Sequence, residues 1–338
     1  MSVMSYLDAL AEGLRTEMLR DPRVVAFGED SIGGTGCAGS PGGAWGPTRG
    51  LSEVVPGQIW DAPITEAAFV GAAVGAAATG LRPVVDLLFV DFVGVCFDQI
   101  LNQASKLRFM SGGKASVPLV IRALTGAGMR RGAQHSAVLA PLFAHQPGLK
   151  VLAPATPADA KGLIAAAIRD DDPVVLLESK MLYFTQGEVP DGEHLVPIGT
   201  ARIARAGSDV TIVALGACVP TALAAAETLA EAGIEAEVVD PRTLAPLDTA
   251  AIVASVDRTG GLVVVDESYP VCSLASEIAA TVAEHSTGLR RPVRRVTAPA
   301  APTPFSPPLE DAWIPGPAQV VAAATQVVGA RPFAGVPR

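Results

Sequence analysis

The chain has 338 residues, of which 49% are hydrophobic and 17% charged, and its formal net charge is −9. This length favours two domains, and the apolar content excludes a disordered polyelectrolyte. The acidic balance and the absence of a basic run disfavour nucleic-acid binding, which needs clustered Lys and Arg. Four scattered cysteines without a CxxC pair are typical of the reducing cytoplasm and argue against structural zinc.

The apolar residues do not predict a membrane protein. The most apolar stretch, 67–97, is interrupted by Arg82, Asp86 and Asp91, so no uncharged run reaches the roughly 18 residues that a spanning helix needs. Residues 1–22 lack the basic region and apolar core of a signal peptide. We therefore expect the apolar excess to lie in buried strands and a large protein interface.

Apolar, β-branched runs alternate with helical patterns along the chain. The expected strands are 23–27, 83–88, 118–123, 150–153, 173–178, 209–215, 236–240, 261–266 and 293–296. The expected helices are 5–19, 66–80, 93–109, 136–144, 157–169, 220–232, 249–256, 274–285 and 317–328. Several strands are apolar nearly throughout, as in sheets covered on both faces. The alternation predicts an α/β protein with doubly wound, mainly parallel sheets.

Two local features refine this organisation. Ser5 and Asp8 are placed as a capping box at the start of the first helix. Over 186–199 the composition changes to Gly, Pro and charged residues, and a new α/β series follows. We therefore expect one domain over 1–190 and a second over 199–338.

A glycine-rich stretch at 31–46 contains Gly-Thr-Gly-Cys-Ala-Gly at 34–39, a literal GxGxxG. A dinucleotide fingerprint must pass from a strand directly into a helix. Here Ser-Pro-Gly-Gly follows at 40–43 and cannot open a helix. The stretch therefore predicts a flexible loop.

Glu66 is the first candidate for chemistry. It follows Thr65, which can cap the helix, and a first-turn carboxylate favoured by the helix dipole would contribute about 0.3–1 kcal/mol. The helix has no other charged residue up to Arg82, so Glu66 could instead lie at a buried or interfacial end, where its pKa would rise. The residues alone leave both readings open.

His135 is the second candidate. It follows the glycine-rich, basic segment 126–132 at an expected helix start. It could be a proton-transfer group near a ligand or a polar capping residue. The other three histidines show no metal-ligand spacing, and the chain has no GxSxG motif or P-loop.

Together, motifs along nearly the whole chain resemble the β subunit of thiamine-diphosphate-dependent 2-oxo acid dehydrogenases. They are Pro-Ile-Thr-Glu at 63–66 and the segments 85–92, 97–104, 110–113, 133–136, 147–151, 159–163, 168–173 and 240–243. Within the family, the most similar are acetoin dehydrogenase β subunits, by the segments 92–99, 44–46, 304–307 and 309–311, although 137–140 departs from their pattern. The resemblance implies a transketolase-like pyrimidine-binding domain followed by a transketolase C-terminal domain for dimerisation and docking, without catalytic groups of its own.

In this family the cofactor site is divided between two chains. The α subunit holds the diphosphate and Mg²⁺ through a Gly-Asp-Gly motif, which this sequence lacks. The resemblance therefore implies that this chain is the pyrimidine half and is inactive alone. It also implies an assembly of two α and two β chains, served by a lipoyl-bearing acyltransferase.

The resemblance also implies roles for individual residues. Glu66 would hydrogen-bond the pyrimidine ring nitrogen and favour the imino tautomer that activates the cofactor, Phe92 would stack on the pyrimidine, and Glu29 would be a polar cofactor contact. His135 would position substrate or move protons on the substrate side. In some relatives a structural K⁺ is held by backbone carbonyls, here those of Leu119, Ala167, Ile168, Asp170 and Asp172.

The implied reaction is cleavage of acetoin to acetaldehyde with transfer of the acetyl unit to lipoamide. Three alternatives remain: a pyruvate or branched-chain 2-oxo acid dehydrogenase β subunit, a two-carbon transfer enzyme of secondary metabolism, and a non-catalytic nucleotide-binding or scaffold protein. The last is disfavoured because Glu66, Phe92 and His135 all lie in matching contexts.

Overall fold

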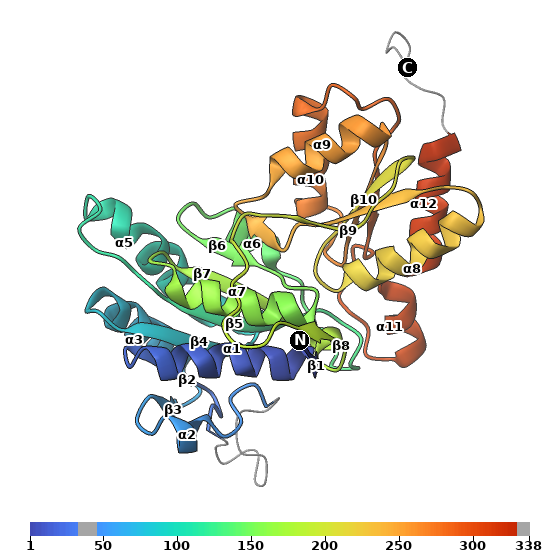
Figure 1. Ribbon diagram of the computed structural model, residues 1–338. Coiled ribbons are helices and arrows are strands. Elements are labelled where there is room, and N and C mark those ends of the chain that lie inside the picture. Colours follow the sequence, from blue (N-terminus) through green and yellow to red (C-terminus); the bar gives the residue numbers. More distant parts are fainter. Residues whose placement is uncertain (33–45, 330–338) are drawn as a thin grey trace. The chain divides into compact units, whose positions relative to one another are not determined.

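The computed structural model describes residues 1–32 and 46–329. The chain divides into two compact units (Figure 1). The first unit contains Met1–Thr125 and Leu142–Ile198, and the second contains Gly126–Pro141 and the chain from Gly199 onward. The GxGxxG segment at 34–39, and the loop expected there, lie outside the described residues.

The first unit is built on a parallel sheet. Its strand order is β6-β7-β5-β4-β2-β3, and each neighbouring pair is parallel. The strands are β2 (Val24–Gly28), β3 (Ile59–Asp61), β4 (Arg82–Phe89), β5 (Val120–Thr125), β6 (Lys150–Leu152) and β7 (Val174–Ser179). Three of the four inner strands, β2, β5 and β7, are buried at every position, which is why they are apolar almost throughout.

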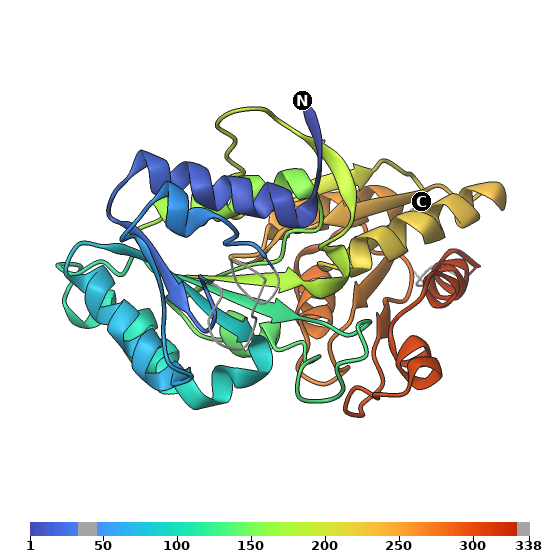
Figure 2. The same cartoon turned by 90° about the horizontal axis from the view of Figure 1, so that it is seen from below.

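Helices cover both faces of this sheet (Figure 2). On one face α1 (Tyr6–Arg20) packs along α7 (Pro157–Arg169). The opposite face carries α3 (Glu66–Ala78) and the continuous run α4 (Val93–Asp98), η2 (Gln99–Ala104) and α5 (Ser105–Met110). The remaining elements are α2 (Leu51–Val54), η1 (Val90–Phe92), η3 (Lys180–Leu182), α6 (Ala140–Ala144), which straddles the unit boundary, and the antiparallel pair β1 (Ser2–Ser5) and β8 (Gln186–Val189).

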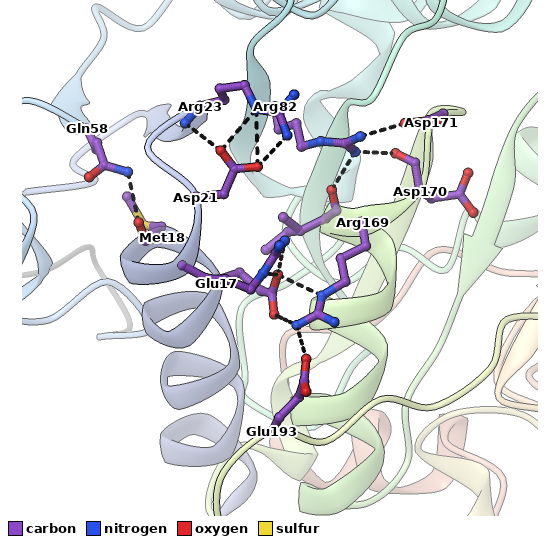
Figure 3. A network of polar contacts seen from close by, with 12 residues as sticks. Glu17, Met18, Asp21, Arg23, Gln58, Arg82, Arg169, Asp170, Asp171 and Glu193 are labelled. Carbon is purple, nitrogen blue, oxygen red and sulfur yellow. Dashed lines mark hydrogen bonds and ion pairs between the residues drawn. The ribbon is translucent and has the colours of Figure 1, made fainter.

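Glu17 joins α1 to α7 through a buried ion-pair network (Figure 3). Its carboxylate is 1% exposed and accepts two hydrogen bonds from Arg169, at 2.6 and 3.0 Å. Arg169 also pairs with Glu193 at 2.5 Å. The helices approach closely at Gly13, where an added Cβ would lie 2.6 Å from Ile164 Cγ2. The small residue and the ion pairs together fix the α1–α7 contact.

The second unit has a five-stranded sheet in the order β14-β13-β10-β11-β9, in which only the edge pair β11–β9 is antiparallel. The strands are β9 (Arg202–Arg205), β10 (Val210–Ala214), β11 (Ala236–Asp240), β13 (Leu262–Asp266) and β14 (Arg294–Thr297), and β12 (Thr243–Ala245) follows β11 along the chain. The helices are α8 (Cys218–Glu231), α9 (Thr249–Thr259), α10 (Leu274–His285), α11 (Pro307–Trp313) and α12 (Pro317–Gly329). Here α8 packs with α12, and α9 with α10.

The expected α/β class with mainly parallel sheets is confirmed. Of the expected capping box, the Ser5 half is confirmed, because its hydroxyl accepts from the Asp8 amide at 3.0 Å, whereas the Asp8 carboxylate accepts from the Ser5 hydroxyl at 2.6 Å. The helix expected to begin at Ser136 is wrong: it begins at Ala140. Pro141 is favoured in a first turn, where its missing N–H has no partner to lose. No helix in the described parts is long and apolar enough to cross a membrane.

Candidate active site

Three of the candidate residues follow neighbouring strands of the first unit. Glu29 comes directly after β2, Glu66 opens α3 after β3, and Phe92 ends η1 after β4. Strands β3, β2 and β4 are adjacent and parallel, so their carboxyl ends lie at one edge of the sheet. This edge is where open α/β sheets bind ligands.

Glu66 carries a buried carboxyl group at the start of α3. It is 8% exposed, and no group among the described residues hydrogen-bonds to its side chain. Thr65 is the residue before the helix, but its hydroxyl donates to the Pro63 carbonyl at 3.2 Å, so the expected Thr65 side-chain cap is wrong. Buried polar groups normally have partners. A carboxyl group left without one is available for a ligand.

Glu66 influences the titration of two neighbouring groups, Glu29 and Cys96. Burial, and then the charges of Asp30 and Glu66, raise the pKa of Glu29. Burial, with a further contribution from Glu66, raises the pKa of the Cys96 thiol to about 12. Glu29 and Glu66 are therefore within electrostatic reach of each other, and a proton or a hydrogen-bond donor at this edge would relieve their repulsion.

Phe92 lies in an aromatic pair. Its ring meets the Phe89 ring edge to face, with centroids 5.8 Å apart and an interplanar angle of 81°. The buried Lys180 ammonium lies 5.4 Å from the centroid of Phe89. Phe92 itself is only partly buried, so it retains accessible ring surface that is able to stack against a planar ligand.

Next to this edge is a pocket with a buried charge cluster, which the sequence alone did not predict. Arg122 donates to both carboxylate oxygens of Glu178, at 2.6 and 2.9 Å, and lies 3.4 Å from Asp86. Tyr183 donates its hydroxyl to Glu178 at 2.5 Å. The pocket is lined by Pro47, Asp86, Leu88, Arg122, Ala123, Leu124, Glu178 and Tyr183. The sequence signal that could have predicted this cluster is the presence of charged residues, Arg122 and Glu178, within otherwise apolar strands.

His135 is on a different unit from Glu29, Glu66 and Phe92. It belongs to Gly126–Pro141, a segment that groups with the second unit although it directly follows β5 of the first. Its side chain is partly exposed. It is not at a helix start, since the next helix begins five residues later.

Four of the five carbonyls that the resemblance assigns to K⁺ already accept a hydrogen bond within the chain. Those of Ile168 and Asp170 both accept from Nη1 of Arg82, each at 3.0 Å. Figure 3 shows Arg82 beside Asp170. The Leu119 carbonyl accepts from Val174, and that of Ala167 from Asp170. A carbonyl oxygen has two lone pairs, so acceptor capacity remains. In the described ranges no cluster of three His, Cys, Asp or Glu residues could hold a metal.

Two family models cover most of the chain. Residues 2–186 match the transketolase pyrimidine binding domain, and residues 199–320 match the transketolase C-terminal domain. A split-gene transketolase, solved as an inactive β4 tetramer, aligns over 96% of this chain and 98% of its own with a TM-score of 0.78 and 24% identity. That likeness shows the fold.

Curated relatives match over almost their full length. The acetoin:2,6-dichlorophenolindophenol oxidoreductase β subunit of Cupriavidus necator is 53% identical over 95% of this chain and 96% of its own. Its Bacillus subtilis counterpart is 47% identical, over 97% and 98%. The 2-oxoisovalerate dehydrogenase β subunit of Bacillus subtilis is 41% identical, over 96% and 98%. The chain therefore belongs to the family of β subunits of thiamine-diphosphate-dependent dehydrogenases, and the sequence resemblance is confirmed.

Proposed function

We propose that this chain is the pyrimidine-holding β subunit of an acetoin-cleaving dehydrogenase. The observation that carries the proposal is the buried Glu66 carboxyl group, which accepts no hydrogen bond from any residue that the structure describes and opens a helix at the ligand-binding edge of the sheet. The identity to two acetoin-oxidising β subunits supports the substrate. Related β subunits named for 2-oxoisovalerate and pyruvate supply the alternative substrates.

The chemistry of the edge fits the pyrimidine of thiamine diphosphate. A protonated carboxyl group donates one hydrogen bond, and a ring nitrogen accepts one. In this role Glu66 holds a proton at the ring nitrogen, Phe92 stacks on the ring face, and Glu29 makes a polar contact beside it. When bound, thiamine diphosphate supplies the nucleophilic carbon that cleavage of a bond next to a carbonyl requires.

His135 serves the substrate side, where it positions the hydroxyketone or moves a proton at its oxygen. The overall reaction breaks one C–C bond of acetoin and releases acetaldehyde. The remaining two-carbon unit leaves as an acetyl group, its two electrons reduce the lipoyl disulfide, and one sulfur keeps the acetyl group while the other takes the proton. The acceptor in this scheme is a lipoyl-bearing acyltransferase.

The partner is an α subunit that brings the diphosphate and Mg²⁺ site, in an assembly of two α and two β chains. The absence of a Gly-Asp-Gly motif from the sequence supports this division. Sedimentation should show that the purified chain binds thiamine diphosphate only after the α subunit is added. A thiamine-diphosphate-binding monomer would contradict the division.

A structural K⁺ at the turn after α7 is also part of the proposal. Its support is the match of segment 168–173 to the family pattern; because the Ile168 and Asp170 carbonyls accept from Arg82, K⁺ would have to use their second lone pairs. The carbonyls of Leu119, Ala167 and Asp172 would complete the site.

Substrate choice is tested by a direct comparison. The complex is reconstituted with its α partner and assayed with a dye as electron acceptor for acetoin, pyruvate and 2-oxoisovalerate. We expect the highest kcat/KM for acetoin. A clear preference for either oxo acid would overturn the substrate and leave the cofactor roles of Glu66 and Phe92 in place.

A further inference from the structure

The segment Gly126–Pro141, here called the His135 loop, is fastened by carboxylates from far along the chain. Glu310, on α11, is fully buried and accepts from the backbone N–H groups of Gly128 at 2.8 Å and Arg130 at 3.1 Å. Its carboxylate also pairs with the Arg130 guanidinium at 2.6 Å. One side chain therefore satisfies three donors of the loop.

A second carboxylate holds the beginning of the loop. Glu267 is 8% exposed and accepts from the Ala127 N–H at 2.5 Å. An added Cβ at Gly126 would lie 3.1 Å from a Glu267 oxygen, so the backbone passes directly over this carboxylate. Glu267 and Glu310 thus bind amides from three of the four residues between Ala127 and Arg130.

The backbone of the loop needs such anchors. Gly126, Gly128 and Gly132 have φ of +88°, +99° and +71°, and Arg130, which is not a glycine, has φ +57°. Glycine gives the free chain many alternatives to these conformations. A left-handed arginine persists only where its surroundings determine it. The two carboxylates supply those surroundings.

We propose that Glu310, assisted by Glu267, is a positioning residue: by fixing the backbone of the loop, it holds His135 in the position from which His135 acts on the substrate. Arg130 is part of the same anchor, since its guanidinium bonds both Glu310 and Asp311. We therefore expect Arg130 to hold the loop rather than to bind a substrate carboxylate. This inference rests on the proposed role of His135.

A double-mutant cycle in the reconstituted complex tests the proposal. Glu310→Gln keeps the side-chain size and removes the charge that binds the loop. We expect it to lower kcat for acetoin about 10-fold or more, while the thiamine diphosphate Kd changes less than about 2-fold. The double variant Glu310→Gln with His135→Gln should be no slower than His135→Gln alone, because both changes remove one function.

The matched control is Asp311→Asn, which removes only the exposed partner of Arg130 and should change kcat less than 2-fold. Arg130→Gln serves as a second anchor variant if Glu310→Gln does not assemble. It should lower kcat/KM for acetoin and for pyruvate by the same factor. A selective loss with pyruvate would show that Arg130 binds the substrate carboxylate and would overturn the proposal.

The remaining outcomes separate the two hypotheses. Suppose that His135→Gln is slow and that adding Glu310→Gln to it lowers the rate further by the full factor seen in the single variant. The positioning role of Glu310 is then wrong, and the role of His135 stands. If Glu310→Gln leaves kcat unchanged, the anchor is also wrong. If His135→Gln turns over acetoin at the wild-type rate, the role of His135 fails, and the anchor proposal falls with it.

Discussion

Two buried carboxyl groups of the first unit have opposite surroundings. Glu178, on β7, is 1% exposed and accepts from Arg122 through two nitrogens and from the Tyr183 hydroxyl. Glu66, at the start of α3, is 8% exposed, and within the described ranges it accepts from no group. Burying a carboxyl group is costly unless it is satisfied. The comparison separates a structural group, satisfied by its neighbours in this chain, from one that no described residue of the chain satisfies.

Asp266, in the second unit, is an intermediate case. Among the described residues its carboxylate accepts only from backbone groups, the Ser268 N–H at 2.9 Å and the Ala275 N–H at 3.4 Å. Burial raises its pKa from 3.8 to about 6, against the opposing effect of these two bonds. Two backbone donors without a cation thus only partly offset the burial of a carboxylate.

The sharpest test of the comparison is Glu66→Gln. The amide keeps the volume and loses the transferable proton, so we expect kcat of the reconstituted complex to fall about 10²-fold or more. Stability should change little, because no bond to the carboxyl group is lost. Glu53→Gln, at an exposed site on α2, is the matched control. If Glu66→Gln turned over acetoin at the wild-type rate, Glu66 would have no catalytic role and would be only a charge at the start of a helix.

Arg122→Met should show the reverse behaviour. It leaves Glu178 buried with a single hydroxyl donor, and breaking a buried ion pair on one side costs about 3–5 kcal/mol of unfolding free energy. Urea unfolding of the complex measures this loss. Arg122→Met combined with Glu178→Leu should recover part of the stability, because both members of the Arg122–Glu178 pair are then removed and only the partly exposed Asp86 loses a cation. A single variant as stable as wild type would contradict the structural role of the cluster.

The smallest expected effect is that of Asp266→Asn, and it depends on pH. Because the folded pKa is raised, the folded state holds an extra proton between about pH 4 and pH 6 and loses stability as the pH rises through this window. The shift corresponds to about 2–3 kcal/mol. The variant should therefore be more stable than wild type above pH 6 and lose this advantage near pH 4. If the difference in unfolding free energy between the variant and wild type were the same at every pH, the pKa of Asp266 would not be raised by folding.

The long elements were predictable from sequence because their signals are local. All nine expected strands are found within one or two residues of their predicted bounds, since buried parallel strands are continuous apolar runs. Short elements such as β1 and β8 were not predictable. Each has four residues, and they pair across the chain, with Ser2 opposite Val189. Nothing in either segment alone indicates its partner.

By itself the sequence determined the α/β class, the family and the place of Glu66, because strand–helix alternation, motif order and the start of a helix are all readable along the chain. Only the tertiary structure decided what surrounds these groups. The burial of Glu66 depends on packing, and the His135 loop follows β5 in sequence but is held by Glu267 and Glu310, 140 and 180 or more residues away. A glycine-rich segment has no strong local preference, so distant carboxylates were able to determine its conformation.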